Sequence, residues 1–475
     1  MIKGFPYPNL LRFFEEISAI PRGSGHEEGM VAYLSRFAKE RNLYCYTDEY
    51  KNVLIRKPAC EGYEHRAPIL LQGHADMVCE KNEGVKHDFL KDPLCLYEEN
   101  GWLRAKGTTL GADDGVAVAA MLAILDGETD AHPELECLFT SNEEAGMDGV
   151  LGFDYSLLRS RMMINMDGCD DRTILAGCAG GVRTSVNLSV EEEVPEAPCL
   201  SIRIGGLAGG HSGEDIHRGR ANAIKLMGMI LSELLKGHTD LRLVTLWGGD
   251  KDNAIPREVE AHICLSDTRA AMTVLSEMAL TIKETLVAED SGFFMETAET
   301  DAPETVMDGE STRRVITFLD SVPNGVLSMH PHLEGLVSTS RNLGGIYADV
   351  TGAKAIFLSR SDREECLDRA QEEIDGYAAS LGGRSHHLYR FPGWEFSVES
   401  EIRRRYAEAY RSLFGEEIGV ELIHAGLECG VIKRALPDMD MLSVGPRVIN
   451  LHSPDEALEL ASFARFFEVL LLTLK

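Results

Sequence analysis

The sequence lacks any apolar run long enough to cross a membrane. No stretch approaches the roughly 18 consecutive apolar residues that a spanning helix needs. The first twenty residues, MIKGFPYPNLLRFFEEISAI, alternate apolar with charged side chains, which is not the pattern of a secretory signal. These absences predict a cytoplasmic protein without a membrane partner.

Paired cysteine motifs are also missing. The eleven cysteines are scattered along the chain, and none forms a Cys-x-x-Cys pair. The sequence therefore predicts neither a disulfide framework nor a thiolate zinc knuckle, and it favours a reducing compartment.

Positive charge is scarce. The chain has 47 Lys and Arg against 77 Asp and Glu, which gives a formal net charge of −30. Nucleic acid and anionic membrane surfaces would repel such a protein, so neither is expected as a partner. The composition is otherwise that of an ordinary globular protein, and 475 residues exceed what one core holds, so at least two domains are expected.

Residues 1–185 have the rhythm of an α/β domain with a mainly parallel sheet, because short apolar runs alternate with amphipathic stretches. Buried strands are predicted at 69–71, 135–140 and 162–166. The run VAVAAMLAIL after Asp114 is apolar all round and predicts a buried helix. Ser24 to Glu27 has the spacing of a capping box for a helix through Val31 and Phe37.

The composition changes from about residue 186, shortly before the acidic stretch VEEEVPEAP at 190–198. We predict an inserted α+β domain over 186–384, with a strand at 200–204 followed by a helix, and a return to the first domain over 385–475. That last segment should contain a strand at 441–444 and a final helix capped by Ser453 to Glu456. The catalytic domain is then discontinuous, because the histidine of this tail needs partners from the first 185 residues.

Metal-binding residue types recur just past the carboxyl ends of predicted strands, the edge where open α/β sheets bind ligands. They are His74 with Asp76, Asp113 with Asp114, Glu143 with Glu144, Asp167, and His452. Two imidazoles with several carboxylates suit zinc, manganese or cobalt better than calcium or magnesium. The adjacent pair Glu143 and Glu144 points the same way, since neighbouring carboxylates repel unless a cation or a shared proton compensates them.

Each element of this set has a structural explanation when it is taken alone. Acidic residues favour helix amino termini, which would account for Asp113 and Asp114. Asp167 could start a turn, and His452 could be a buried core histidine. Those explanations leave unexplained why all five sites fall at strand ends.

Several motifs together resemble the M20 metallopeptidases, in particular the aminoacyl-histidine dipeptidase branch. They are HADMV, KGTTLGADDG, SNEEAGMDG, INMDG and INLHSPDE, followed within the middle segment by GGLAGGHSGEDIH, GGDKDNAIPRE and STSRNLG. The resemblance spans nearly the whole chain in order. It implies a catalytic domain of the zinc-exopeptidase type with an inserted lid and dimerisation domain.

The resemblance also implies a role for each metal-site residue. Asp113 would bridge two divalent ions, which are zinc by default, with manganese or cobalt as alternatives. One ion would be completed by His74 and Asp167, and the other by Glu144 and His452. Asp76 would steady His74, and Glu143 would be the general base.

The inserted domain is expected to recognise the substrate. His211 resembles a lid histidine that reaches the site of a partner subunit in a homodimer and stabilises the oxyanion. Asn253 and Arg341 match positions that hold the substrate, and Arg341 would bind the carboxylate of the substrate. Gly426 matches a position that lines the pocket. Asp114 departs from the family pattern, where asparagine is frequent.

These features predict a dipeptidase that cleaves Xaa-His and other unblocked dipeptides. A deacylase or a tripeptide aminopeptidase is the alternative, because the same metal centre can hydrolyse any amide. A catalytically silent binding protein would be indicated by the loss of Glu143 or of a ligand, and the sequence retains all of them.

Overall fold

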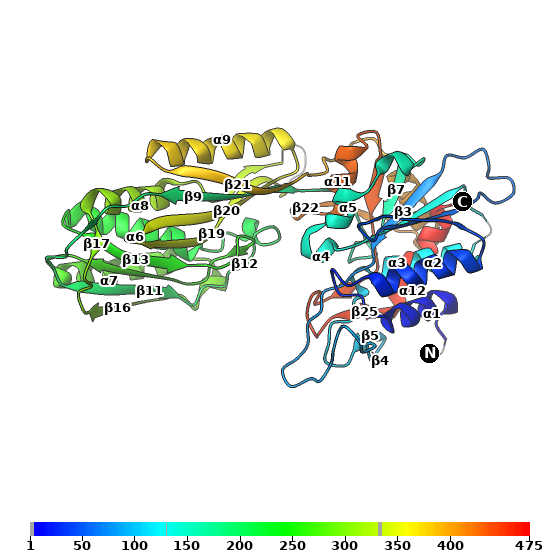
Figure 1. The fold of residues 1–475 in the computed structure, drawn as a ribbon, viewed down its shortest axis with the longest axis horizontal. Coiled ribbons are helices and arrows are strands. Elements are labelled where there is room, and N and C mark those ends of the chain that lie inside the picture. Colours follow the sequence, from blue (N-terminus) through cyan, green and yellow to red (C-terminus); the bar gives the residue numbers. More distant parts are fainter. Residues whose placement is uncertain (1–3, 130, 331–334) are drawn as a thin grey trace. The chain divides into compact units, whose positions relative to one another are not determined.

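The computed structural model describes residues 4–129, 131–330 and 335–475. The chain forms two compact units (Figure 1). Unit 1 comprises residues 1–177, 394–422 and 427–475, and unit 2 comprises residues 178–393 and 423–426. These limits lie within ten residues of the boundaries expected at 185 and 384. Among the described residues, no helix combines the length and apolarity that a membrane crossing requires.

Unit 1 is built on an eight-stranded sheet whose centre is parallel. The strand order is β1 (Tyr44–Thr47), β2 (Val53–Lys57), β6 (Leu135–Thr140), β3 (Ile69–His74), β7 (Met162–Asn165), β23 (Asp440–Ser443), β8 (Thr173–Cys178) and β22 (Gly419–Ile423). The pairs β6–β3, β3–β7 and β7–β23 are parallel, and the pairs β1–β2, β2–β6 and β23–β8 are antiparallel. The predicted strands and the mainly parallel sheet are therefore confirmed.

Helices flank this sheet (Figure 1). They are α1 (Pro8–Ser18), α2 (Glu28–Glu40), α3 (Ala112–Leu125), α4 (Glu143–Gly146), α5 (Asp148–Gly152), α10 (Glu401–Phe414), α11 (Glu428–Ala435) and α12 (Leu460–Thr473). Helix α3 is buried along nearly its whole surface, as its all-apolar sequence predicts. A smaller sheet joins β4 (Leu96–Glu99), β5 (Trp102–Ala105), β25 (Ala457–Glu459) and β24 (Val448–Ile449).

Two predicted helix caps are wrong. Helix α2 forms, but Ser24 does not cap it; the Ser24 hydroxyl donates instead to Asp76 at 2.7 Å. The segment Ser453 to Glu456 is a turn that precedes β25, and α12 begins only at Leu460. Glu456 accepts hydrogen bonds from the amides of residues 110–113, whereas Ser453 bonds locally to the Asn450 carbonyl. The contacts of Ser24 and Glu456 are long-range, and local sequence spacing does not encode them.

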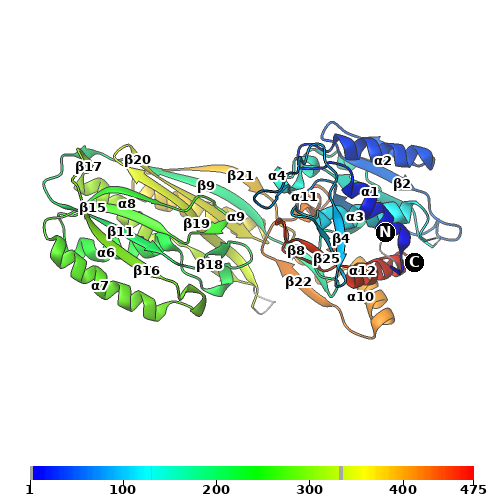
Figure 2. The same ribbon diagram turned by 90° about the horizontal axis from the view of Figure 1, so that it is seen from below.

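Unit 2 is an antiparallel sheet with helices on one face. Figure 2 shows its strands side by side: in order they are β16 (Phe294–Thr300), β11 (Cys199–Gly205), β15 (Val259–Cys264), β13 (Arg242–Gly248), β19 (Val337–Asp349), β20 (Gly352–Ser361), β9 (Gly180–Leu188) and β21 (Arg384–Phe391), with β18 (Gly325–Met329) beside β19. The helices are α6 (Ala223–Gly237), α7 (Thr268–Thr285), α8 (Gly309–Ser321) and α9 (Glu364–Ser380). Their apolar residues share one core with the strands.

Short ladders complete this unit. Strand β12 (Gly210–His211) pairs with β14 (Ala254–Ile255), and β10 (Glu192–Glu193) pairs with β17 (Val306–Met307).

One disulfide departs from the sequence prediction. Cys199 and Cys264 lie directly opposite each other on the antiparallel strands β11 and β15 and form a disulfide bond. The two residues are 65 positions apart in the sequence, so no short motif could reveal the pair.

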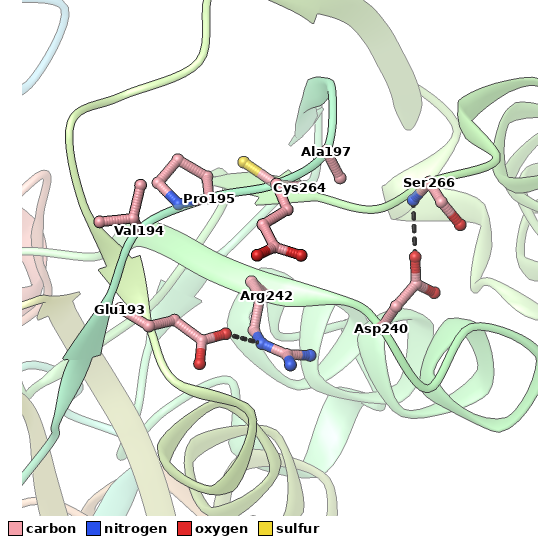
Figure 3. Close-up of a pocket in the computed structure, with 9 residues that line it drawn as sticks. Glu193, Val194, Pro195, Ala197, Asp240, Arg242, Cys264 and Ser266 are labelled. Carbon is pink, nitrogen blue, oxygen red and sulfur yellow. Dashed lines mark hydrogen bonds and ion pairs between the residues drawn. The ribbon is translucent and has the colours of Figure 1, made fainter.

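A surface pocket of unit 2 lies beside this disulfide (Figure 3). Three of its four charged side chains are engaged: Arg242 pairs with Glu193, and Asp240 accepts a hydrogen bond from the Ser266 amide at 2.7 Å. None of the predicted site residues lines it, so this pocket is not a candidate for the chemistry.

Candidate metal centre

The parallel strands of unit 1 bring the predicted ligands to one edge of the sheet. His74 is the last residue of β3 and lies opposite Thr140, the last residue of β6. Glu143 follows β6 by three residues, and Asp167 follows β7 by two. Because parallel neighbours end at the same edge, residues far apart in sequence converge there.

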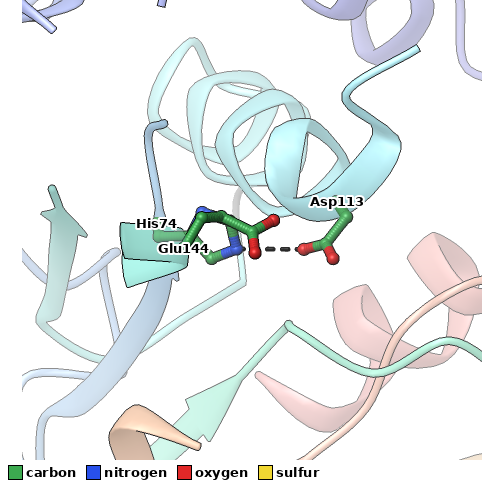
Figure 4. A group of neighbouring side chains, drawn as sticks. All are labelled: His74, Asp113 and Glu144. Carbon is green, nitrogen blue, oxygen red and sulfur yellow. Dashed lines mark hydrogen bonds and ion pairs between the residues drawn. The ribbon is translucent and has the colours of Figure 1, made fainter. Parts of the chain in front are cut away.

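Asp113 lies between the two histidines. Its Oδ1 is 2.9 Å from His74 Nε2, and its Oδ2 is 3.2 Å from His452 Nε2. Glu144 approaches the same place, with its Oε1 3.1 Å from His452 Nε2. Figure 4 shows His74, Asp113 and Glu144 pointing toward one another. One carboxylate facing two imidazoles with separate oxygens is the arrangement expected of a bridging ligand.

Asp167 joins the group from the side of His74. Its Oδ1 lies 3.9 Å from His74 Nε2. The ligand atoms of His74, Asp114 and Asp167 fall within 4.8 Å of one another, as do those of His74, Asp113 and Glu144. Asp114, which the sequence left without a ligand role, is buried and accepts a hydrogen bond from the His74 amide at 3.2 Å.

Asp76 contacts several of the segments that carry the predicted ligands. Its Oδ1 is 3.4 Å from His74 Nδ1, and its carboxylate accepts hydrogen bonds from the amides of Glu143 at 3.1 Å and Glu144 at 3.3 Å. Asp76 thus fixes the glutamate pair as well as facing the histidine, a contact typical of residues that orient metal ligands.

Crowding of like charges perturbs the acids of the site. Burial raises the pKa of Glu143 well above its ordinary value, and the nearby carboxylates of Glu428 and Glu144 raise it further. Burial and the charge of Asp113 likewise raise the pKa of Asp167. For Asp113 itself burial acts upward, but the hydrogen bonds from His452 and His74 outweigh it and hold the pKa low.

This donor set fits divalent metal ions. Two imidazoles and several carboxylates converge, and burial together with neighbouring carboxylates raises the pKa values of Glu143 and Asp167, which a bound cation would offset. The hydrogen bonds of His452 with Asp113 and Glu144 raise its pKa to about 10. A cation bound there would take over the role of that proton.

A buried polar chain beneath the ligands is absent from the sequence-based prediction. The Asn165 amide donates to Gln72 at 2.7 Å, and both Gln72 and Thr140 donate to Glu428, at 2.5 and 2.7 Å. The first three residues lie on β7, β3 and β6, the strands that carry Asp167, His74 and Glu143. The signal that could have revealed it is a polar side chain inside an apolar strand, as in ILLQG.

The lid residues predicted from the sequence lie in unit 2. His211 is in β12, where its amide donates to Asp215 at 2.9 Å, and the next residue, Ser212, donates its amide to the Asn253 carbonyl at 2.8 Å. His211 and Asn253 are thus neighbours through the β12–β14 ladder. Asn253 is exposed.

Arg341 does not have the position expected of a substrate ligand. It is fully buried against α9, where its guanidinium donates to Glu373 at 2.9 Å, to the Ala370 carbonyl and to Ser359 at 3.3 Å. Its donor groups are therefore committed to the fold. The role of Arg341 in binding a substrate carboxylate stays a prediction, which these contacts within the fold do not favour.

Arg360 is on the opposite face of the same sheet. It pairs in register with Ser340, one residue before Arg341, so strand alternation directs the two arginines to opposite sides. Arg360 is 5% exposed, and its Nε has no hydrogen-bond partner among the described residues. Burial lowers its pKa to about 10, against the opposing charges of Asp252 and Glu214.

Gly426 and His424 border Arg360. A methyl group at Gly426 would meet the Phe391 ring at 2.8 Å, and the Arg360 guanidinium lies 6.0 Å from the centre of that ring. The His424 Nε2 is 2.8 Å from the Ser340 hydroxyl. Burial, with the charges of Arg360, His217 and His211, lowers the pKa of His424 to about 3. Arg360 therefore brings a buried positive charge close to His424.

Comparison with known proteins identifies relatives along the full chain. The profile described as peptidase family M20/M25/M40 matches residues 70–475. The cytosol non-specific dipeptidase of Escherichia coli is 36% identical over 481 aligned positions, which cover 99% of this chain and 97% of that protein.

Solved structures agree. The aminoacylhistidine dipeptidase of Vibrio alginolyticus superposes with a TM-score of 0.92 and 34% identity, covering all of this chain and 97% of that one. An aminopeptidase from Bacillus cereus shares the fold, with a TM-score of 0.56 and 13% identity over 99% of this chain and 98% of that one.

Proposed function

The chain belongs to peptidase family M20/M25/M40, and we propose that it is a di-metal dipeptidase that hydrolyses short peptides with free termini. The observation that carries the proposal is the carboxylate of Asp113 facing His74 with one oxygen and His452 with the other. Dipeptidase activity of the Escherichia coli and Vibrio relatives, each more than 30% identical over nearly the full length, supports the substrate class.

Asp113, His74, Asp167, Glu144 and His452 would hold two divalent ions, with Asp114 close to the first. We propose zinc as the default metal and manganese or cobalt as alternatives. Such ions, when bound, would lower the pKa of an attacking water and polarise the peptide carbonyl.

Glu143 is the proposed general base. Its amide is fixed by Asp76, and its raised pKa brings the carboxylate toward the range in which it can both accept and return a proton near neutral pH. It takes a proton from the attacking water and delivers it to the leaving amine.

The face of unit 2 that holds Arg360 is the proposed site of substrate recognition. Arg360 binds the terminal carboxylate of the peptide, because a planar guanidinium with unused donors suits bidentate pairing. His211, with Asn253 beside it, donates to the carbonyl oxygen as negative charge develops there. Gly426 lets the Phe391 ring pack close to the backbone, because any side chain at this position would meet the ring.

We further propose a homodimer formed through unit 2, with His211 serving the partner's site. Strand β16 is at the edge of the sheet, and the adjoining helix α7 exposes Leu280, which is 68% accessible. An unpaired edge strand beside an exposed apolar side chain favours association. A cytoplasmic location is also proposed, supported by the Escherichia coli relative, which is named as a cytosolic enzyme.

A substrate panel tests the function. The protein, stripped of metal and then reloaded with zinc, manganese or cobalt, should hydrolyse dipeptides with free termini, including Xaa-His. Tripeptides and N-acyl amino acids, each assayed at the same concentration, should react slowly. Activity confined to N-acyl amino acids would show a deacylase, and activity confined to tripeptides would show an aminopeptidase.

A further inference from the structure

Glu456 is a buried glutamate that is hydrogen-bonded to the loop leading to Asp113. Its two carboxylate oxygens accept hydrogen bonds from four consecutive backbone amides: Leu110 at 2.8 Å, Gly111 at 2.9 Å, Ala112 at 2.8 Å and Asp113 at 3.4 Å. The side chain is 2% exposed. Amide donors aimed at a buried carboxylate give strong, directional bonds, so this loop has little freedom.

The same residue belongs to the segment that carries His452. His452 precedes Glu456 by four positions. The chain turns between them, and the Glu456 amide donates a hydrogen bond to the Ser453 carbonyl at 3.1 Å. His452 has a backbone φ of +59°, a conformation that residues other than glycine rarely adopt, so its surroundings must hold it. Glu456 therefore joins the segment of one histidine ligand to the loop of the bridging carboxylate.

Arg22 holds the same loop from another side. Its guanidinium donates to the Gly111 carbonyl and, at 2.8 and 3.2 Å, to the carbonyls of Asp76 and Ala75. Arg22 is 1% exposed. It thus joins the Asp113 loop to the segment that follows His74, the other histidine ligand.

We propose that Glu456 is a positioning residue for the metal centre, which sets the orientation of Asp113 between His74 and His452 without touching ion or substrate. Arg22 is its counterpart on the His74 side. Three ligand-bearing segments are in this way held to one another through their backbones by two buried side chains of opposite charge. The inference rests on the proposed two-metal site, and it adds the device that aligns the halves of that site.

The test replaces Glu456 by Gln, which keeps the shape but puts an amide NH₂ where an amide-accepting oxygen stood. Competition with a chelator should show the affinity for at least one of the two ions falling about 10- to 100-fold, the usual cost of removing a partner that orients ligands. The visible spectrum of the cobalt-loaded variant should change, since it reports ligand geometry. With saturating metal, kcat for a dipeptide should fall while KM stays close to that of the wild type.

Asp455→Asn is the matched control, because it makes the same chemical change on the neighbouring, exposed residue. It should leave metal affinity and the cobalt spectrum unchanged. Glu456→Asp, which keeps the charge on a shorter side chain, should give an intermediate loss, and it serves if the Gln variant does not fold. Wild-type affinities and spectrum in a folded Gln or Asp variant would overturn the proposal. The metal readouts need no substrate, so they stand apart from any failure of the dipeptidase assignment.

Discussion

The ligand edge of unit 1 and the face of unit 2 that holds Arg360 bury charges of opposite sign. In unit 1 burial and neighbouring carboxylates raise the pKa values of Glu143 and Asp167. In unit 2 burial and the charge of Arg360 lower the pKa of His424 to about 3. The difference fits the two proposed tasks, metal binding in unit 1 and recognition of a substrate carboxylate in unit 2.

The two regions also differ in how their residues are held. The predicted ligands of unit 1 lie at or just after strand ends or in the first turns of α3 and α4, and side chains such as Asp76 and Glu456 hold these segments through backbone amides. Arg360 lies within a strand, so sheet register alone sets its direction. Changes in unit 1 should therefore act through metal and proton transfer, whereas changes in unit 2 should act through substrate binding.

The largest effect is expected from Glu143→Gln. Loss of the base should lower kcat by about 10³-fold, since general bases contribute 10² to 10⁴ in comparable sites, while both ions remain bound. Metal content by elemental analysis, measured beside kcat, separates the two roles. The neighbouring change Glu144→Gln is the control and should lose one ion. If Glu143→Gln lost metal while Glu144→Gln retained it, the roles assigned to the pair would be reversed.

A smaller effect is expected at Arg360. Arg360→Met should lower kcat/KM for a dipeptide on the order of 100-fold, mostly through KM, because a buried charge pair with the substrate carboxylate is lost. The wild type should lose a similar factor on a dipeptide with an amidated C-terminus, and the variant should barely distinguish the two substrates. Steady-state kinetics on this matched pair measures it.

Arg341→Met tests the sequence-based prediction that Arg341 binds the substrate carboxylate. Because Arg341 is bonded to Glu373 and α9, its loss should lower the midpoint of thermal unfolding, and the ratio of rates on the free and amidated dipeptides should stay as in the wild type. A selective loss of carboxylate preference in Arg341→Met, with Arg360→Met unaffected, would restore the original assignment.

The main strands and part of the predicted metal site can be predicted from the sequence. The strands at 69–71, 135–140 and 162–166 follow from apolar runs, and the approach of Glu144 and Asp167 to His74 follows from the rule that parallel strands share an edge. Asp113 reaches the same place from the first turn of α3 instead. Arg341 and Arg360 are both arginines on neighbouring strands, and only the pairing register decides which face each one occupies.

Long-range contacts set the other limit. Glu456 stands at the position of a helix-capping residue in the sequence pattern. The backbone amides that donate hydrogen bonds to it nevertheless lie more than 340 positions away in the sequence. The disulfide partners Cys199 and Cys264 are likewise joined by sheet pairing. Local patterns predict a polar residue that needs a partner, and the tertiary fold chooses the partner.

The smallest effect, on stability alone, is expected at Glu428. Burial raises its pKa to about 7, against the opposing effects of His74 and of the hydrogen bond from Thr140. Below pH 4.5 the carboxyl is protonated in both the folded and unfolded chains. Between pH 4.5 and 7 the unfolded chain releases this proton while the folded chain retains it, so the free energy of unfolding falls as the pH rises.

Glu428→Gln cannot ionise and should escape this loss. In the metal-free protein its free energy of unfolding, relative to the wild type, should increase by about 1 to 3 kcal/mol from pH 4.5 to 7 and then level off. Denaturant titrations at a series of pH values measure the difference, with the exposed Glu421→Gln as control. Parallel profiles for the wild type and Glu428→Gln would mean that Glu428 ionises alike in both states. The raised pKa values in unit 1 would then be confined to the acids at the metal centre itself. The contrast in charge with unit 2 would then rest on those residues alone.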